Sequence, residues 1–387
     1  MQVSTSAPGL WTRSFTLAVI ATGLVFVGFY FLIPALPPFA LMLGASKSQV
    51  GVVVGISSIA AVATRLLTGH RMDRLGKKRF LLGGLLIFSV AAACYGQATS
   101  LGWLIALRMV QGVGWGWITT AFSTLAADLS PVARRGEGMG YWGLGPPLAM
   151  AIGPLFGSVL LADLGATFVF YTTAALALFA ALICLPIEEP PIHASPDSSP
   201  RRFEKAALVP AVTLFLSSLS YGAIIAFIPV EFAGAPRRAG LFFSIYALST
   251  LVTRPMAGSI SDRRGRLAVI HPGLLLSAAG VLLIGLTAVP GALWLAAILY
   301  GVGISGAFLG LMALTIDSSP PSSRGAAMAG FFSAYDLAIA FGALLLGPLY
   351  ERFGFFTMNA VAAAMIAASQ AVLMVFGRGG GGRESEP

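Results

Sequence analysis

Long apolar runs, separated by short polar segments, are the feature of this sequence that most constrains its fold. We expect helices near residues 15–37, 49–68, 80–97, 102–126, 138–161, 167–186, 207–230, 240–259, 269–288, 292–315, 325–347 and 355–376. Each run is about 20 residues long, the length that a helix needs to cross a bilayer. None alternates between polar and apolar residues, as membrane-spanning β-strands do. The sequence therefore predicts an all-α integral membrane protein with twelve transmembrane helices.

The composition excludes several other classes of protein. Hydrophobic residues make up 57% of the chain and charged residues only 10%. Soluble domains carry about 25% charged residues, so an ordinary soluble enzyme and a disordered regulator are excluded. The net charge of +9 does not indicate a nucleic-acid partner, because the basic residues lie in short clusters between apolar runs. The three histidines have no metal-ligand spacing, and we expect no metal and no cofactor.

One long polar stretch divides the chain. Residues 188–206 are rich in proline, serine and charge, which is typical of a flexible linker. We expect one six-helix bundle over residues 1–187, a second over 207–377 and a flexible tail over 378–387. Most Lys and Arg residues fall on one side of the membrane if the N-terminus is cytoplasmic. This predicts a multi-pass protein of the cell (inner or plasma) membrane with both termini and the linker in the cytoplasm.

The two halves resemble each other at one constant offset in residue number. Matching pairs include Thr64-Arg65 with Thr253-Arg254, Asp73-Arg74 with Asp262-Arg263, Gly76 with Gly265, and Asp128 with Asp317. Chance explains alanine or leucine matches in so biased a sequence, but not matches at Asp and Arg. An even number of spans separates the copies, so the sequence predicts a parallel repeat around an axis along the membrane normal.

A loop motif supplies a family resemblance. Residues 69–78 read GHRMDRLGKK, and this resembles the G-x-x-x-D-[RK]-x-G-[RK]-[RK] motif of the major facilitator superfamily; residues 258–266 carry a degenerate copy. The resemblance implies the major facilitator fold and a cytoplasmic latch between the halves. We expect its residues to be Gly69, Asp73, Arg74, Gly76, Lys77, Asp128, Gly258, Asp262, Arg263 and Gly265. The alternative is ordinary basic loop chemistry, which does not need the spaced Gly and Asp residues.

A second motif lies in the fifth predicted span. Gly153, Pro154 and Gly157 resemble part of the G-x-x-x-G-P-x-x-G-G motif of proton-driven antiporters within the superfamily. This resemblance, to 12-span drug and sugar efflux permeases, implies a monomeric antiporter that exchanges protons for a solute. Close packing of small residues, without any role in coupling, is the alternative.

Two charged residues in apolar runs are the predicted proton-coupling groups. Asp336 lies in the middle of the eleventh predicted span, where a carboxylate needs a proton, a partner or both. Arg108 lies in the fourth, in a segment that resembles the superfamily's R-x-x-Q/G-x-G pattern. A structural hydrogen bond is the alternative for Asp336, and extension to the membrane surface is the alternative for Arg108. Many drug exporters of the superfamily carry an acid in the first span, and this sequence does not.

The predicted substrate cavity combines six polar or aromatic residues. The resemblance assigns spans one, four, seven and ten to a midplane cavity, and the candidates are Tyr30, Gln111, Trp115, Tyr221 and Tyr300, with Tyr335 beside Asp336. We therefore predict a secondary active transporter, and not an enzyme, that exports a small organic solute by rocker-switch alternating access. A proton-coupled importer on the same scaffold is the first alternative. A polytopic membrane sensor or enzyme is a weaker one, because no nucleophile–base pair or soluble output domain is visible.

Overall fold

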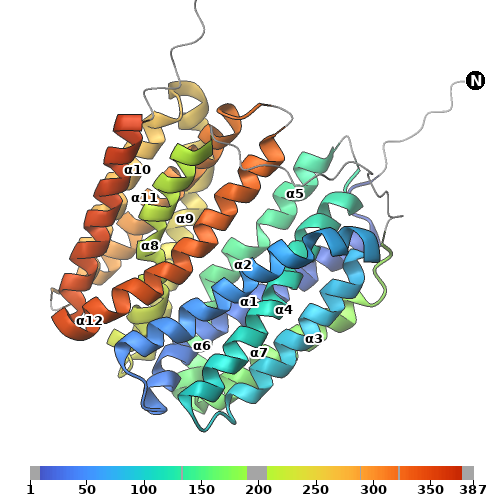
Figure 1. The fold of residues 1–387 in the computed structure, drawn as a ribbon, viewed down its shortest axis with the longest axis horizontal. Helices are drawn as coiled ribbons and strands as arrows, with labels where there is room; N and C mark the ends of the chain where they lie inside the picture. Colours follow the sequence, from blue (N-terminus) through green and yellow to red (C-terminus); the bar gives the residue numbers. More distant parts are fainter. Residues whose placement is uncertain (1–8, 132–133, 190–206, 288, 321–322, 377–387) are drawn as a thin grey trace, which may run out of the picture.

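The computed structural model describes residues 9–131, 134–189, 207–287, 289–320 and 323–376, and over these ranges its regular structure is entirely α-helical (Figure 1). The helices are α1 (Arg13–Met42), α2 (Lys47–Leu75), α3 (Lys77–Tyr95), α4 (Leu101–Leu129), α5 (Arg135–Gly143), α6 (Gly145–Leu164), α7 (Ala166–Cys184), α8 (Leu208–Glu231), α9 (Pro236–Arg264), α10 (Leu267–Ile284), α11 (Ala292–Asp317) and α12 (Arg324–Phe376). The prediction of an all-α membrane fold is confirmed.

The helices follow the predicted runs with two differences. The fifth run is divided at Leu144 into α5 and α6, because Pro146 lacks a backbone N–H and favours the first turn of a new helix. The last two runs lie in α12, which bends at Gly354, where φ is 85°. Nine helical stretches in the described ranges are long and apolar enough to cross a membrane. The count of twelve crossings stays a prediction.

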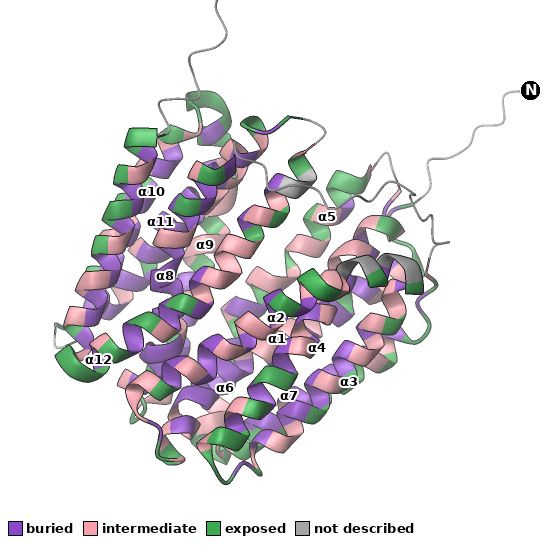
Figure 2. Ribbon diagram, in the orientation of Figure 1, coloured by how far each residue is buried: buried purple, intermediate pink, exposed green. Residues whose placement is uncertain are grey.

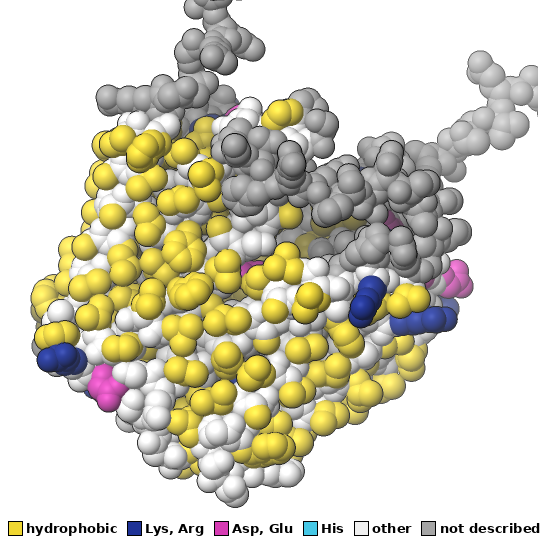
Figure 3. Space-filling view, viewed as in Figure 1, with side chains coloured by type: hydrophobic (Ala, Val, Ile, Leu, Met, Phe, Trp, Pro, Cys, Tyr) yellow, Lys and Arg dark blue, Asp and Glu magenta, His cyan; other side chains and the backbone are white. Residues whose placement is uncertain are grey.

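Large apolar side chains cover the outside of the bundle. On α9, Leu248, Val252, Met256 and Ile260 are exposed at four-residue intervals, which places them on one face of the helix. In Figure 3, apolar side chains spread over the described surface, and charged ones are few and lie mostly near its margins. Buried residues gather between the helices in Figure 2. An apolar exterior around a packed interior fits lipid as the surrounding solvent.

The internal repeat is visible in the turns. Gly76 and Gly265 end α2 and α9 with φ of 97° and 87°, and Gly165 and Gly354 have φ of 83° and 85°. Both pairs have the offset of the sequence repeat. These positive φ values strain any residue with a Cβ, which explains why glycine recurs at both copies.

Two helix pairs form the most extensive contacts between the halves, which we define as α1–α7 (the N-terminal half) and α8–α12 (the C-terminal half). Within the halves, α1 packs on α6 and α7, α3 on α4, α8 on α12, and α10 on α11. Between them, α2 packs on α12 and α6 packs on α9. The two halves lie side by side in Figure 1. The two interfaces are equivalent under the repeat, since the start of α9 is the repeat counterpart of the start of α2.

The ends of the bundle differ in how the halves meet. We call the end where α1 begins and α7 ends the linker end, since the linker follows α7, and the other end the opposite end. In the described part of the chain, every hydrogen bond between the halves lies at the opposite end or in the middle of the bundle. The linker residues 190–206 and the tail 377–387 lie outside the described residues, and the predicted domain boundaries stay predictions.

Candidate functional site

One ion pair joins the two halves inside the bundle. Arg65 of α2 donates through Nη1 to Asp336 Oδ2 of α12, and its Nη2 donates to Thr119 Oγ1 of α4 at 3.0 Å. The two charged side chains are 28% and 25% exposed. Asp336 lies twelve residues into α12, about 18 Å along the helix, where a carboxylate needs a partner of opposite charge. Arg65 is that partner, and this pairing was not predicted from the sequence.

Arg108 lies inside the N-terminal half. Its side chain is 5% exposed; Nε donates to the Val53 carbonyl at 2.9 Å, and the two Nη groups donate to Ser57 and Gln111. Tyr95 donates to the same Gln111 oxygen at 2.5 Å. These bonds hold α4 against α2 and satisfy a charge that is costly to bury alone. The structure thus gives Arg108 a positioning role toward Gln111, while its part in proton coupling stays a prediction.

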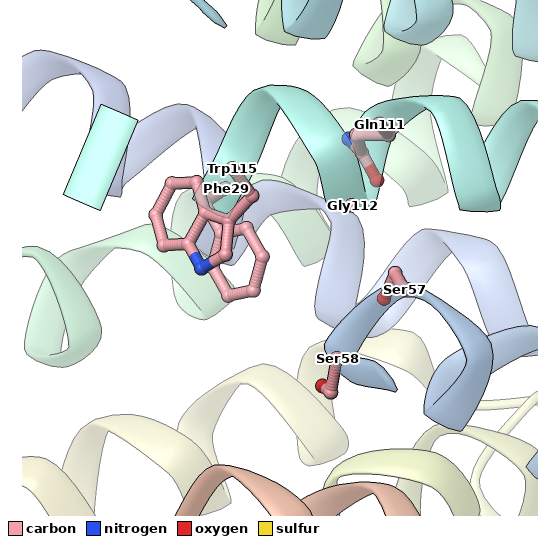
Figure 4. Close-up of a pocket in the computed structure, with 6 residues that line it drawn as sticks. All are labelled: Phe29, Ser57, Ser58, Gln111, Gly112 and Trp115. Atoms are coloured by element: carbon pink, nitrogen blue, oxygen red, sulfur yellow. The ribbon is translucent and has the colours of Figure 1, made fainter. Parts of the chain in front are cut away.

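A small recess lies beside this network (Figure 4). Trp115 stacks on Phe29, with ring centroids 4.0 Å apart and planes 12° apart, and these rings form its apolar wall. Its polar wall carries the hydroxyls of Ser57 and Ser58 and the amide of Gln111. The Gln111 Nε2 is buried and has no hydrogen-bond partner among the described residues. The predicted cavity residues Gln111 and Trp115 therefore line the same recess.

Four tyrosines cluster in the C-terminal half. The Tyr221 ring centroid lies 6.1 Å from that of Tyr335 and 5.7 Å from that of Tyr246, which stacks on Tyr300 at 5.6 Å. Tyr300 is fully buried, and its hydroxyl lies 3.0 Å from Ser220 Oγ. The sequence predicted three of the four. It missed Tyr246 because the tyrosine lies on α9, outside the spans that the resemblance assigns to the cavity.

The glycine-proline motif of the fifth predicted span lies in α6, between α1 and α9. A Cβ at Gly153 would come 2.7 Å from the Cβ of Tyr30, and one at Gly157 would come 2.9 Å from the α1 backbone. On the other side, a Cβ at Gly240 of α9 would come 2.7 Å from the Pro154 carbonyl oxygen. The small residues therefore let α6 approach helices of both halves closely. Tyr30, a predicted cavity residue, packs on this motif.

The described latch residues bond within each half at the linker end. Lys77 pairs with Asp128 in the N-terminal half. Arg266 Nε donates to Asp317 at 2.8 Å and its Nη1 to Asp262 at 2.5 Å in the C-terminal half. These hydrogen bonds, that to Asp317 first, raise the pKa of Arg266 above its ordinary value. Arg266 and Asp317 are the repeat counterparts of Lys77 and Asp128, so the same bridge occurs twice.

The remaining latch residues are only partly described. Gly76 and Gly265 form the turns noted above, Arg263 is exposed, and Gly258 has open space around it. Gly69, Asp73 and Arg74 lie outside the residues whose side chains are described. The latch across the two halves stays a prediction.

Two carboxylates at the opposite end were missed by the sequence analysis. Glu351 of α12 accepts hydrogen bonds from the Ser46 hydroxyl and the Ser48 backbone N–H of α2, both at 3.0 Å. Asp163 of α6 accepts from Arg237 of α9 at 2.6 Å. Both contacts bring an acid of one half to the start of a helix in the other half, where a negative charge is favoured. From the sequence alone, charged residues at helix ends such as Glu351 and Asp163 cannot be distinguished from residues that face solvent.

Comparison with known proteins adds the family context. The profile described as Major Facilitator Superfamily matches residues 18–230 and 210–386. An uncharacterized MFS-type transporter of Burkholderia mallei is 28% identical over 348 residues, 86% of this chain and 84% of the relative. Multidrug resistance protein 2 of Bacillus subtilis is 31% identical over 157 residues, 41% of this chain and 39% of the relative. A POT family transporter crystallised with 5-aminolevulinic acid superposes with a TM-score of 0.80 at 13% identity, covering 96% of this chain and 98% of that one.

Proposed function

Because the chain belongs to the major facilitator superfamily, and is thus a transporter of small molecules and not an enzyme, we propose that it exports a small organic solute in exchange for protons. The observation that carries this proposal is the Arg65–Asp336 ion pair. It joins α2 to α12 across the two halves, and its acid can be neutralised by a single proton. A group with these two properties can couple protonation to the separation of the halves.

The proposed coupling follows from electrostatics. When Asp336 is ionised, attraction to Arg65 holds α12 against α2. Protonation removes that attraction and leaves a neutral carboxyl group, which costs less to move through a dry interior. The two halves can then rock apart at this interface. Thr119, which accepts from Arg65 at 3.0 Å, keeps the guanidinium partly satisfied in either state.

The direction of opening rests on the proposed membrane orientation. The excess of Lys and Arg favours the linker end as the cytoplasmic one. Glu351 and Asp163 accept hydrogen bonds from the other half at the opposite end, so we assign this structure to an arrangement closed toward the outside. In the reverse arrangement these bonds break, and the loop-motif residues of the two halves come together.

Export is supported by two observations. The Gly153-Pro154-Gly157 segment, which resembles the antiporter motif, lies between α1 and α9, where it can follow movement of either half. A relative over part of the chain is named as a multidrug resistance protein. Antiport and import by symport make opposite predictions about which pH gradient drives accumulation.

The test begins with a solute screen on the purified chain, because a ligand that binds the folded state raises its unfolding temperature. The best solute is then followed in proteoliposomes with an imposed pH gradient. An antiporter accumulates solute when the lumen is acidic, since protons leave as solute enters. Accumulation only when the outside is acidic identifies a symporter, and accumulation without any gradient dependence contradicts proton coupling.

A further inference from the structure

Two arginines related by the internal repeat have different surroundings. Arg65 pairs with Asp336 across the interface of α2 and α12. Its repeat counterpart is Arg254, on α9 at the interface with α6. The residue that corresponds to Asp336 at this second interface is Pro147, which carries no charge. In the described part of the chain, no carboxylate lies within ion-pairing distance of Arg254.

Arg254 lies on the side of α9 that faces away from lipid. Val252 and Met256, on the outer stripe, are 57% and 60% exposed. Arg254 is two residues from each of them, which is about 200° around the helix axis. Thr250, one turn earlier on the same side as Arg254, donates to the Gly301 carbonyl of α11 at 3.3 Å. The guanidinium is partly exposed, ten residues before the end of α9 and so about 15 Å from the linker end.

The surroundings of Arg254 favour an anion. Arg65, Arg108 and Arg254 all lie well inside the helices. Among the described residues, Asp336 is the one acid at a similar depth. Arg108 is already satisfied by carbonyl, hydroxyl and amide oxygens. A cation inside the membrane that has no fixed partner attracts a mobile anion.

We propose that Arg254 binds the anionic group, a carboxylate, of the transported solute. A guanidinium pairs with a carboxylate through two parallel N–H donors, which sets orientation as well as charge. The substrate class is therefore organic anions that carry a carboxylate, an assignment that rests on the proposed transport function.

The experiment uses the full chain in phosphatidylcholine nanodiscs. Binding of benzoate, 2-naphthoate and indole-3-acetate is compared with binding of the corresponding neutral amides and of 2-naphthylmethylamine. We expect the carboxylates to raise the unfolding temperature and the amides and the amine to have little effect. Arg254→Gln should weaken carboxylate binding roughly tenfold or more, because a charged hydrogen-bonded pair is lost. Arg254→Lys should keep part of the affinity.

The control is Arg264→Gln, which removes a positive charge at the exposed end of the same helix. It should leave carboxylate binding unchanged. Binding of none of the carboxylates, equal binding of amides, or unchanged affinity in Arg254→Gln would overturn the proposal. The comparison of carboxylate binding with amide binding uses the unaltered chain, so it remains a test even if a variant fails to fold. Each of these outcomes still allows proton-coupled export of a neutral or cationic solute, so failure here is distinct from failure of the proposed function.

Discussion

Neutralising Asp336 tests the ion pair as a switch between arrangements. Asp336→Asn keeps the shape of the side chain and removes its charge, so Arg65 loses its partner across the halves. Exposed ion pairs contribute up to about 1 kcal/mol, whereas breaking a buried pair costs about 3–5 kcal/mol. Both side chains are about one-quarter exposed, so we expect about 2 kcal/mol. That energy shifts the equilibrium between the two arrangements roughly 30-fold.

Distances between spin labels at the linker end report this shift. Cysteines at Leu75 and Leu267, both exposed and in different halves, carry the labels after Cys94 and Cys184 are replaced by alanine. We expect Asp336→Asn to increase the population with a short distance, because closure of the linker end follows release of α12 from α2. The control is Glu137→Gln, which breaks the exposed pair with Arg134 within the N-terminal half. If Asp336→Asn gives the same distribution as Glu137→Gln and the unaltered chain, the ion pair does not govern the equilibrium.

Three further predictions follow from other contacts. Gly51→Leu should abolish transport by preventing closure of the opposite end, because even a Cβ there would come 2.1 Å from the Ala343 carbonyl oxygen; Gly102→Ala, in open space, should have little effect on the same assay. Hydrogen bonds from Ser48, and then Ser46, lower the pKa of Glu351, which lies in the turn between the last two predicted spans. The contact of Glu351 with Ser46 and Ser48 should therefore be present above pH 4, which is about the pKa of an unfolded Glu, and be lost as the pH falls through the lower pKa of the folded state. Distances between spin labels at the opposite end should show this pH dependence, and Glu351→Gln should remove it. Arg108→Met should lower the free energy of unfolding by about 2 kcal/mol or more, and with it the unfolding temperature, because Gln111 and the Val53 carbonyl lose a buried charged donor. An unchanged unfolding temperature would contradict the positioning role of Arg108.

The fold was predictable because its determinants are local. Long apolar runs specify membrane helices, and the residue pairs at one constant offset specify two similar halves. The break at Leu144 and the bend at Gly354 also have local causes in proline and glycine. Local signals do not, however, say which helices meet across the halves.

The candidate site was predictable only in part. Asp336 is visible in the sequence because a carboxylate within an apolar run is costly. Its partner Arg65 lies 271 residues away, and the pairing depends on the packing of α2 against α12. Glu351 could not be recognised from the sequence, because charged residues are common at helix ends and only the packing of the two halves shows that this one contacts α2. Arg254 matches Arg65 in the repeat, but the lack of an acid opposite it among the described residues becomes visible only when α6 and α9 are seen together.

Transport driven by a pH gradient in proteoliposomes tests the central claim most directly. The unaltered chain and Asp336→Asn are compared for accumulation of a solute found by the stability screen, and for exchange of that solute down its gradient. We predict that Asp336→Asn abolishes accumulation driven by an acidic lumen, because the fixed neutral side chain cannot exchange a proton, while downhill exchange is at least partly kept. Accumulation by Asp336→Asn against the solute gradient at the level of the unaltered chain would contradict the account and leave the Arg65–Asp336 pair a structural contact.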